Sequence, residues 1–339
     1  MNRITAFLPE AHAGNSTVNQ AQREDWPDIA KGMGITLVVY GHVARGLFNA
    51  GIPLDPVWHQ RIDGFIYAFH MPLFFWVSGY LYFFSIQKKG TLAVLQDKLR
   101  NVAYLYVLWS LVHGLIEVAM SHYTNGHLAL RDVLALWQPR AHFWFLYVLF
   151  LVFAIATGVY RFRNRWATLG VLLVAILWYQ NPGVLEMGYP LVLVGPWLVY
   201  FAAGVAVAQF KPVVFRQAGW VLPVLLAPLA LGSNWPLLWA SLGVVSVLSL
   251  SRWLDVHGHG PARAALIYLG QLSLPIYLLH ILSGSGIRIV LQKFVGLQNV
   301  GVHLIAGMAL ALLVPILVHQ LSVRYHWRFL WAWPVARHG

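Results

Sequence analysis

The sequence contains no cysteine and few charged residues. The absence of cysteine excludes disulfides, iron–sulfur ligation and any thiol-borne covalent intermediate. Charged residues make up 10% of the 339 positions, whereas a soluble domain carries about 25%. Hydrophobic residues make up 59%, and 16 Trp and 15 Tyr suit the aromatic belts of an integral membrane protein. The first 22 residues also lack the apolar core of a signal peptide, so we expect a short cytosolic tail over residues 1–27.

Apolar runs of membrane-spanning length follow one another along most of the chain, without an internal repeat. They predict an all-α, polytopic membrane helix bundle of about ten transmembrane helices over residues 28–323, followed by a cytosolic tail over 324–339. The predicted spans are 29–47, 65–86, 102–121, 142–160, 167–181, 189–209, 218–233, 235–251, 264–284 and 300–322.

The distribution of positive charge gives the orientation of the bundle. With the N-terminus in the cytosol, 17 of the 23 Lys and Arg residues fall on the inner side, which also places the C-terminus there. Topology therefore explains most of the net charge of +12. We expect the lipid bilayer, rather than nucleic acid, to be the partner of this basic chain.

Lys31 and His42 lie on one face of the first predicted span, about 16 Å apart along its axis. Ionisable groups inside a membrane are expensive and usually mark a functional site. Asp28 can pair with Lys31 three residues later. Lys31, Lys98 and Arg100 lie near the cytosolic face, where they could hold the phosphates of a soluble cofactor. The alternatives are positive-inside anchoring for these cations and a structural interhelical hydrogen bond for His42.

Three histidines in different spans share one predicted depth. His42, His70 and His280 each lie about 6–8 Å inside the outer boundary, and His142 and Trp144 begin the fourth span on that side. This layer predicts a polar cavity that opens outward. Histidine is a natural general base because its unperturbed pKa is near 6.5. The sequence contains no recognisable metal-ligating constellation.

Four stretches of the chain resemble one known family. Residues 28–43 read DIAKGMGITLVVYGHV and residues 69–81 read FHMPLFFWVSGYL; later landmarks are HFWFLYVLF (142–150) and SLPIYLLH (273–280). Together they resemble the integral-membrane acyltransferase-3 family, in particular its branch of fucose 4-O-acetylase-like and exopolysaccharide acetylases. The resemblance covers most of the chain in order.

This resemblance implies transfer of an acyl group, usually acetyl from acetyl-CoA, onto a carbohydrate hydroxyl. The family's catalytic pattern falls on His42, His70 and Ser78. The substrate-binding positions that we expect are His142, Trp144, Tyr277 and His280, and the expected cofactor-binding positions are Asp28, Lys31, Lys98 and Arg100. One departure concerns Arg100: the family often has a Pro-Tyr pair shortly after this arginine, whereas this chain has Ala103-Tyr104.

We therefore expect a membrane O-acetyltransferase in which His42 is the general base. Acetyl-CoA would arrive from the cytosol as co-substrate, and no metal is expected. The acceptor would be a carbohydrate, such as a lipid-linked or exported polysaccharide unit, at the outer side of a bacterial inner membrane. A covalent acyl-histidine intermediate remains open beside direct transfer.

Two other classes of protein fit parts of the pattern. A proton-coupled saccharide transporter could use the intramembrane histidines as a relay, and Met71-Pro72 and Leu274-Pro275 are candidate helix breaks for such a protein. The strings around these two breaks do not repeat, which disfavours that class. A membrane haem protein could instead use a pair of histidines as axial ligands.

Overall fold

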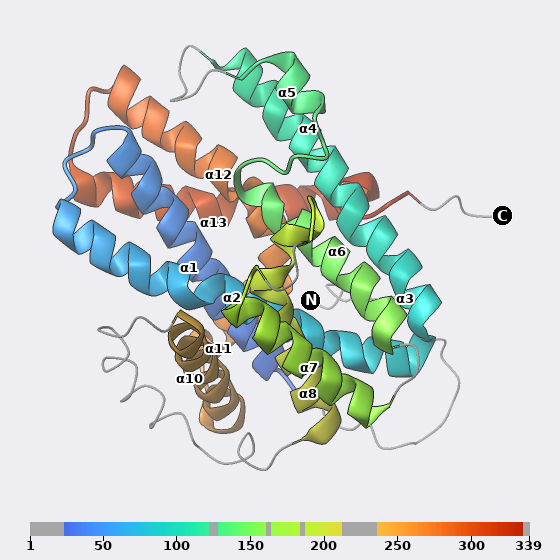
Figure 1. Ribbon diagram of the computed structural model, residues 1–339. Helices are drawn as coiled ribbons and strands as arrows, with labels where there is room; N and C mark the ends of the chain where they lie inside the picture. The colour runs from blue at the N-terminus through green and yellow to red at the C-terminus, as the bar shows by residue number, and fades with distance from the viewer. Residues whose placement is uncertain (1–23, 122–127, 161–163, 184–186, 212–235, 335–339) are drawn as a thin grey trace.

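The computed structural model describes residues 24–121, 128–160, 164–183, 187–211 and 236–334. Every regular element within these ranges is a helix, as predicted for an all-α bundle (Figure 1). The helices are α1 Trp26–Asn49, α2 Pro56–Lys89, α3 Thr91–Lys98, α4 Tyr104–Ala119, α5 Leu130–Leu134, α6 Trp144–Val159, α7 Arg165–Gln180, α8 Gly195–Phe210, α10 Pro236–His257, α11 Pro261–Gln271, α12 Ser273–Ile289 and α13 Val300–Arg324. A π-helical turn, Leu99–Ala103, joins α3 to α4, and another, Val290–Phe294, extends α12.

Six of the described helical segments are long and apolar enough to cross a membrane. They are Pro56–Lys89, Thr91–Ala119, Ala141–Val159, Pro236–His257, Ser273–Phe294 and Val300–Arg324. The shorter helices α7 and α8 are also apolar. The chain is therefore a multi-pass integral membrane protein, and the count of ten spans remains a prediction. The seventh predicted span, 218–233, lies outside the described residues, as do residues 1–23 of the predicted N-terminal tail.

Helix α1 is long enough to span a bilayer, but it is not one of the six most apolar segments. It packs against five other helices, α2, α10, α11, α12 and α13 (Figure 1). More than half of its 24 residues are buried. Because protein rather than lipid surrounds α1, the helix can carry Asp28, Lys31 and His42 at a lower cost than a lipid-facing helix could.

Glycines bring two pairs of helices into backbone contact. A β-carbon added at Gly32 of α1 would overlap the backbone oxygen of Leu266 in α11, and one added at Gly270 would overlap the backbone oxygen of Asp28. The same reciprocal arrangement joins α2 to α8. Small residues at such crossings let helix backbones approach closely, which strengthens packing where no hydrophobic driving force exists.

The ninth predicted span, 264–284, is wrong in its boundaries. The helical chain ends at Gln271 and starts again at Ser273, so α11 is a separate short helix and the membrane-length segment is Ser273–Phe294. Pro275 explains the new start, because the missing N–H of proline costs little in the first turn of a helix.

The candidate break at Met71-Pro72 is also wrong, because α2 continues through Pro72 as one helix of 34 residues. The other candidate break, Leu274-Pro275, lies at the start of α12, so only one of the two prolines marks an interruption.

The C-terminal segment packs against the bundle. The Tyr104 hydroxyl donates to the Phe329 carbonyl at 2.9 Å, and Trp109 Nε1 donates to the Leu330 carbonyl at 2.9 Å. Trp331 stacks on Trp109 with ring centroids 5.9 Å apart. The described part of the predicted tail, up to residue 334, thus covers one side of α4.

Candidate functional site

The second half of α1 delivers His42 into a cluster of imidazoles from three segments of the chain. The His42 ring centroid lies 5.1 Å from that of His280 in α12 and 6.1 Å from that of His142, at the start of the α6 segment. The His142 and His280 rings are 5.3 Å apart. Three of the four histidines that the sequence placed in one layer therefore share one site.

His70 reaches this cluster through Tyr67 on the same helix. The Tyr67 ring lies 4.5 Å from the His70 ring and 6.2 Å from the His42 ring. On the outer side, the Arg45 guanidinium lies 3.2 Å above the Tyr67 ring and forms a bidentate pair with Asp63 at 2.6 and 2.7 Å. The Tyr67 hydroxyl is buried and has no hydrogen-bond partner among the described residues.

Backbone carbonyls orient the imidazoles of His70 and His280. His70 Nδ1 lies 2.8 Å from the Ile66 carbonyl, and His280 Nδ1 lies 2.8 Å from the Tyr277 carbonyl. A carbonyl oxygen only accepts hydrogen bonds, so in both rings the proton is on Nδ1 and Nε2 carries the lone pair. His280 Nε2 is buried and has no partner among the described residues. Both rings, when neutral, present a proton acceptor and not a donor.

His113 in α4 joins the same cluster, although the sequence analysis did not select it. Its ring lies 5.2 Å from the His142 ring, and its Nε2 donates to the Leu278 carbonyl at 2.7 Å. The Tyr277 hydroxyl donates to the His142 carbonyl, which ties α12 to the start of the α6 segment. An imidazole inside the third predicted span was the signal that could have selected His113.

A cavity of about 250 Å³ opens beside His42. Its polar lining comes from α1, α12 and α13. These polar residues are His42, Arg45, Asn49, His280, Ser285, Arg288 and His303. Neither Arg288 nor His303 was selected from the sequence, although both lie on the side of the bundle where the cavity was predicted. Among the described residues, no three His, Asp or Glu side chains are grouped to hold a metal ion.

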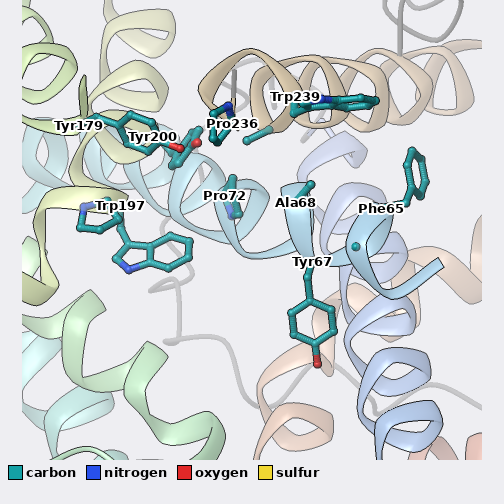
Figure 2. Close-up of a pocket in the computed structure, with 12 residues that line it drawn as sticks. Phe65, Tyr67, Ala68, Pro72, Tyr179, Trp197, Tyr200, Pro236 and Trp239 are labelled. Atoms are coloured by element: carbon teal, nitrogen blue, oxygen red, sulfur yellow. The ribbon is translucent and has the colours of Figure 1, made fainter. Parts of the chain in front are cut away.

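A larger cavity of about 650 Å³ lies between α2, α7, α8 and α10, and half of the residues that line it are aromatic (Figure 2). Tyr179, Trp197, Tyr200 and Trp239 line it. Tyr67 also contributes to the wall, but Figure 2 shows that its ring points away from Trp239. Tyr67 therefore lies between this aromatic cavity and the histidine cluster.

Two predicted site residues lie apart from the histidine cluster. Trp144 packs on Trp197 with ring centroids 4.8 Å apart, and both line a third cavity of about 340 Å³ with Tyr189. Ser78 follows His70 by about 12 Å along α2, next to the crossing with α8. The structure thus separates Trp144 and Ser78 from the group formed by His42, His142, Tyr277 and His280.

The predicted cofactor-binding residues lie toward the other end of α1 and on α3. Lys31 Nζ pairs with Asp28 at 2.7 Å, and Asp28 is almost fully buried. Lys98 Nζ lies 3.4 Å from Asp97 and 5.1 Å above the Phe153 ring. Arg100 is exposed in the π-helical turn after α3. Lys31 is separated from His42 by three helical turns, about 16 Å.

Comparison with known proteins agrees with this architecture. The family model described as an acyltransferase domain matches residues 24–320. The chain therefore belongs to the acyltransferase-3 family of integral membrane acyltransferases, as the sequence motifs predicted.

Two curated relatives are similar to part of the chain. Nodulation protein NolL of Mesorhizobium japonicum is 31% identical over 142 residues, which cover 40% of this chain and 36% of the relative. Nodulation protein NolL of Sinorhizobium fredii is 24% identical over 164 residues, which cover 48% of this chain and 44% of the relative. The chain thus matches less than half the length of either relative. No solved structure matches it.

Proposed function

We propose that this membrane acyltransferase moves an acetyl group from acetyl-CoA to a hydroxyl of a carbohydrate acceptor, with His42 as the general base. The observation that carries the proposal is the position of His42, whose imidazole meets two others at the wall of a cavity in a chain of the acyltransferase family. Histidine can take up a hydroxyl proton near neutral pH.

The chemical step is a substitution at the thioester. His42 accepts the proton of the acceptor hydroxyl while the oxygen of that hydroxyl attacks the acetyl carbonyl carbon. The carbon–sulfur bond then breaks, the acetyl ester remains on the sugar, and the coenzyme thiolate leaves and takes up a proton. Holding the two reactants in one cavity makes the step effectively unimolecular, which can remove several kcal/mol of its barrier.

The negative charge that develops on the acetyl oxygen needs a hydrogen-bond donor. A neutral His70 does not fit this role, because its Nδ1 proton is already given to the Ile66 carbonyl. The Tyr67 hydroxyl fits better: it is buried, it has no partner among the described residues, and its ring lies 6.2 Å from that of His42. We therefore place Tyr67 as donor, and Ser78 as the alternative predicted from the family motif.

Donor and acceptor are proposed to approach from opposite ends of α1. Lys31, Lys98 and Arg100 would hold the phosphates of acetyl-CoA at the cytosolic side of a bacterial inner membrane, with Asp28 fixing the Lys31 ammonium. The acceptor, a lipid-linked or exported saccharide unit, would enter the cavity lined by His42 and His280. His142 and Tyr277 form the wall behind these two imidazoles.

The test is to incubate membranes that contain the protein with radiolabelled acetyl-CoA and to follow the label into sugar and lipid-linked sugar. We expect transfer by the wild type and almost none by His42→Ala. His257→Ala is the matched control, since His257 is exposed at the end of α10 and lies outside the cluster. Normal transfer by folded His42→Ala would exclude this residue as the base. A saccharide transporter would consume no thioester in the same assay.

A further inference from the structure

The cavity beside His42 is lined by two arginines with different electrostatic environments. The Arg45 guanidinium has a carboxylate partner, because Asp63 accepts two hydrogen bonds from it. The side chain of Arg45 is 41% exposed, so solvent also screens its charge. Arg288, by contrast, is 7% exposed.

Arg288 has no carboxylate partner among the described residues. Its Nη1 donates to the Gln292 side-chain oxygen at 3.3 Å, and its Nε has no hydrogen-bond partner within the described ranges. Gln292 is neutral and in turn donates to the Ala50 carbonyl at 2.8 Å. The positive charge of Arg288 is therefore oriented by its neighbours but not neutralised by any described residue.

A buried cation without a counter-ion is costly, and in membrane proteins such a residue usually serves a substrate or ion. Arg288 lines the cavity together with His280, two helical turns earlier on α12, and with His42. Ser285, between the two on α12, adds a hydroxyl to the lining. A guanidinium offers several N–H donors in a planar fork, which matches a carboxylate or a phosphate.

We infer that this cavity binds an anionic group of the acceptor, a carboxylate or a phosphate, and that Arg288 is the residue that selects it. The inference rests on the proposed function, in which the acceptor hydroxyl lies at His42. The acceptor is then an acidic carbohydrate whose anionic group contacts Arg288 while a hydroxyl of the same or the adjoining sugar contacts His42.

The first experiment compares acceptors that differ at carbon 6, where a neutral hydroxymethyl group is replaced by a carboxylate or carries a phosphate. Acetyl transfer from acetyl-CoA is measured with methyl glucoside, methyl glucuronide and methyl glucoside 6-phosphate. For the wild type we expect the KM of the better anionic acceptor to be about tenfold lower than that of methyl glucoside, because one charged hydrogen bond supplies a difference of this size. The better of the two anionic acceptors identifies the group as carboxylate or phosphate. Equal KM values for all three would overturn the inference without any variant.

Variants assign this preference to Arg288. Arg288→Gln should raise the KM of the anionic acceptor to that of methyl glucoside, while Arg288→Lys should restore part of the difference. Gln292→Leu is the structural control, because it breaks the contacts of Gln292 with Arg288 and Ala50 but keeps the charge of Arg288, so the preference for the anionic acceptor should remain. Arg61→Gln controls for surface charge, since Arg61 is exposed and does not line the cavity.

A binding measurement separates this inference from the proposed function. In detergent solution, inorganic phosphate or glucuronate at fixed ionic strength should raise the melting temperature of the wild type and not that of Arg288→Gln. This holds even if none of the three sugars is acetylated, a result that would count against the proposed acceptor chemistry alone. Stabilisation that is equal in both proteins would overturn the anion site. If Arg288→Gln instead changes the preference of the enzyme for succinyl-CoA over acetyl-CoA, the anionic group that Arg288 binds belongs to the acyl donor. The inference about the acceptor would then be overturned.

Discussion

Both ends of α1 carry polar side chains, but their partners differ: ion pairs hold the charges of the first end, whereas at the other end one ion pair, Arg45 with Asp63, lies beside a cluster of imidazoles. At the first end, Lys31 pairs with Asp28. Just before α1, Glu24 pairs with Arg252 of α10, and Asp25 pairs with Arg263 of α11. At the other end, His42 meets imidazoles whose described hydrogen bonds go to backbone carbonyls.

This difference separates a closed end of α1, where helices pack closely, from an open end, where polar groups face a cavity. At the Lys31 end, α11 lies against α1 with its backbone in contact, so the pairs are packed among helices. At the His42 end a cavity remains, and its imidazoles and Arg288 face it. Residues of the two ends should therefore respond differently to substitution.

The largest effect is expected at the open end. His42→Ala should lower kcat by about 10²–10⁴-fold, because this is the range that a general base contributes, while the melting temperature stays near that of the wild type. The comparison of kcat with thermal stability in detergent checks both halves of the statement. A variant that loses activity only together with its fold would give His42 a structural role.

The next effect concerns packing at the closed end. Gly270→Ala should lower the stability by about 3 kcal/mol, because the added methyl group would overlap the backbone of Asp28 and neither helix can yield easily. Gly286→Ala is the matched control on α12: nothing lies within 4 Å of its added β-carbon, and alanine favours a helix by up to about 1 kcal/mol. Thermal unfolding of the two variants should thus shift in opposite directions.

A smaller effect is expected for the proposed donor site. Lys31→Met should raise the KM for acetyl-CoA about tenfold with little change in kcat, as expected when one charged contact to a phosphate is lost. Lys88→Met, an exposed lysine near the predicted cytosolic end of α2, is the control and should leave this KM unchanged. If Lys31→Met lowers the melting temperature but not the affinity for acetyl-CoA, Lys31 serves only its pair with Asp28.

The smallest effect concerns acid stability at the closed end. Burial opposes ionisation of Glu24, but hydrogen bonds from Arg252 and Trp26 outweigh it, so the pKa of Glu24 is lowered from its ordinary value. The ionised pair therefore stabilises the fold above the ordinary glutamate pKa, and this contribution is lost as the pH falls through the lowered pKa. Melting temperatures from pH 7 to pH 3 should fall less for Glu24→Gln than for the wild type. Parallel curves would show that the pair contributes nothing.

Much of the helical architecture could be predicted from the sequence, because apolar runs of membrane length are a strong signal. The break between α11 and α12 lies beside the predicted one at Leu274-Pro275, but the continuity of α2 through Pro72 could not be predicted, since it depends on the tertiary packing around that proline. Periodicity also gave no reason for α1 to lie at the centre of the bundle. The chain's ability to carry Lys31 and His42 on this helix follows from that central position.

The site shows the same division between local and tertiary information. Depth along each span placed His42, His142 and His280 in one layer. In the structure the ring centroids of His280 and His142 lie 5.1 and 6.1 Å from that of His42. Depth says nothing about the direction of a side chain, so it could not show that Trp144 lines a different cavity from the one at His42. Arg288 was missed because a count of charges does not show which cations lack an anion.

The crossing of α2 and α8 limits how the protein can move. A β-carbon at Gly79 would overlap the backbone oxygen of Phe201, and one at Gly204 would overlap that of Trp76, so sliding by a single residue would force a side chain into a peptide group. The register of α2, which carries Tyr67 and His70, is therefore locked to α8. Any widening of the cavity at His42 would then involve α1, α12 and α13, the helices that line it, and a covalent crosslink between α1 and α12 would keep it narrow.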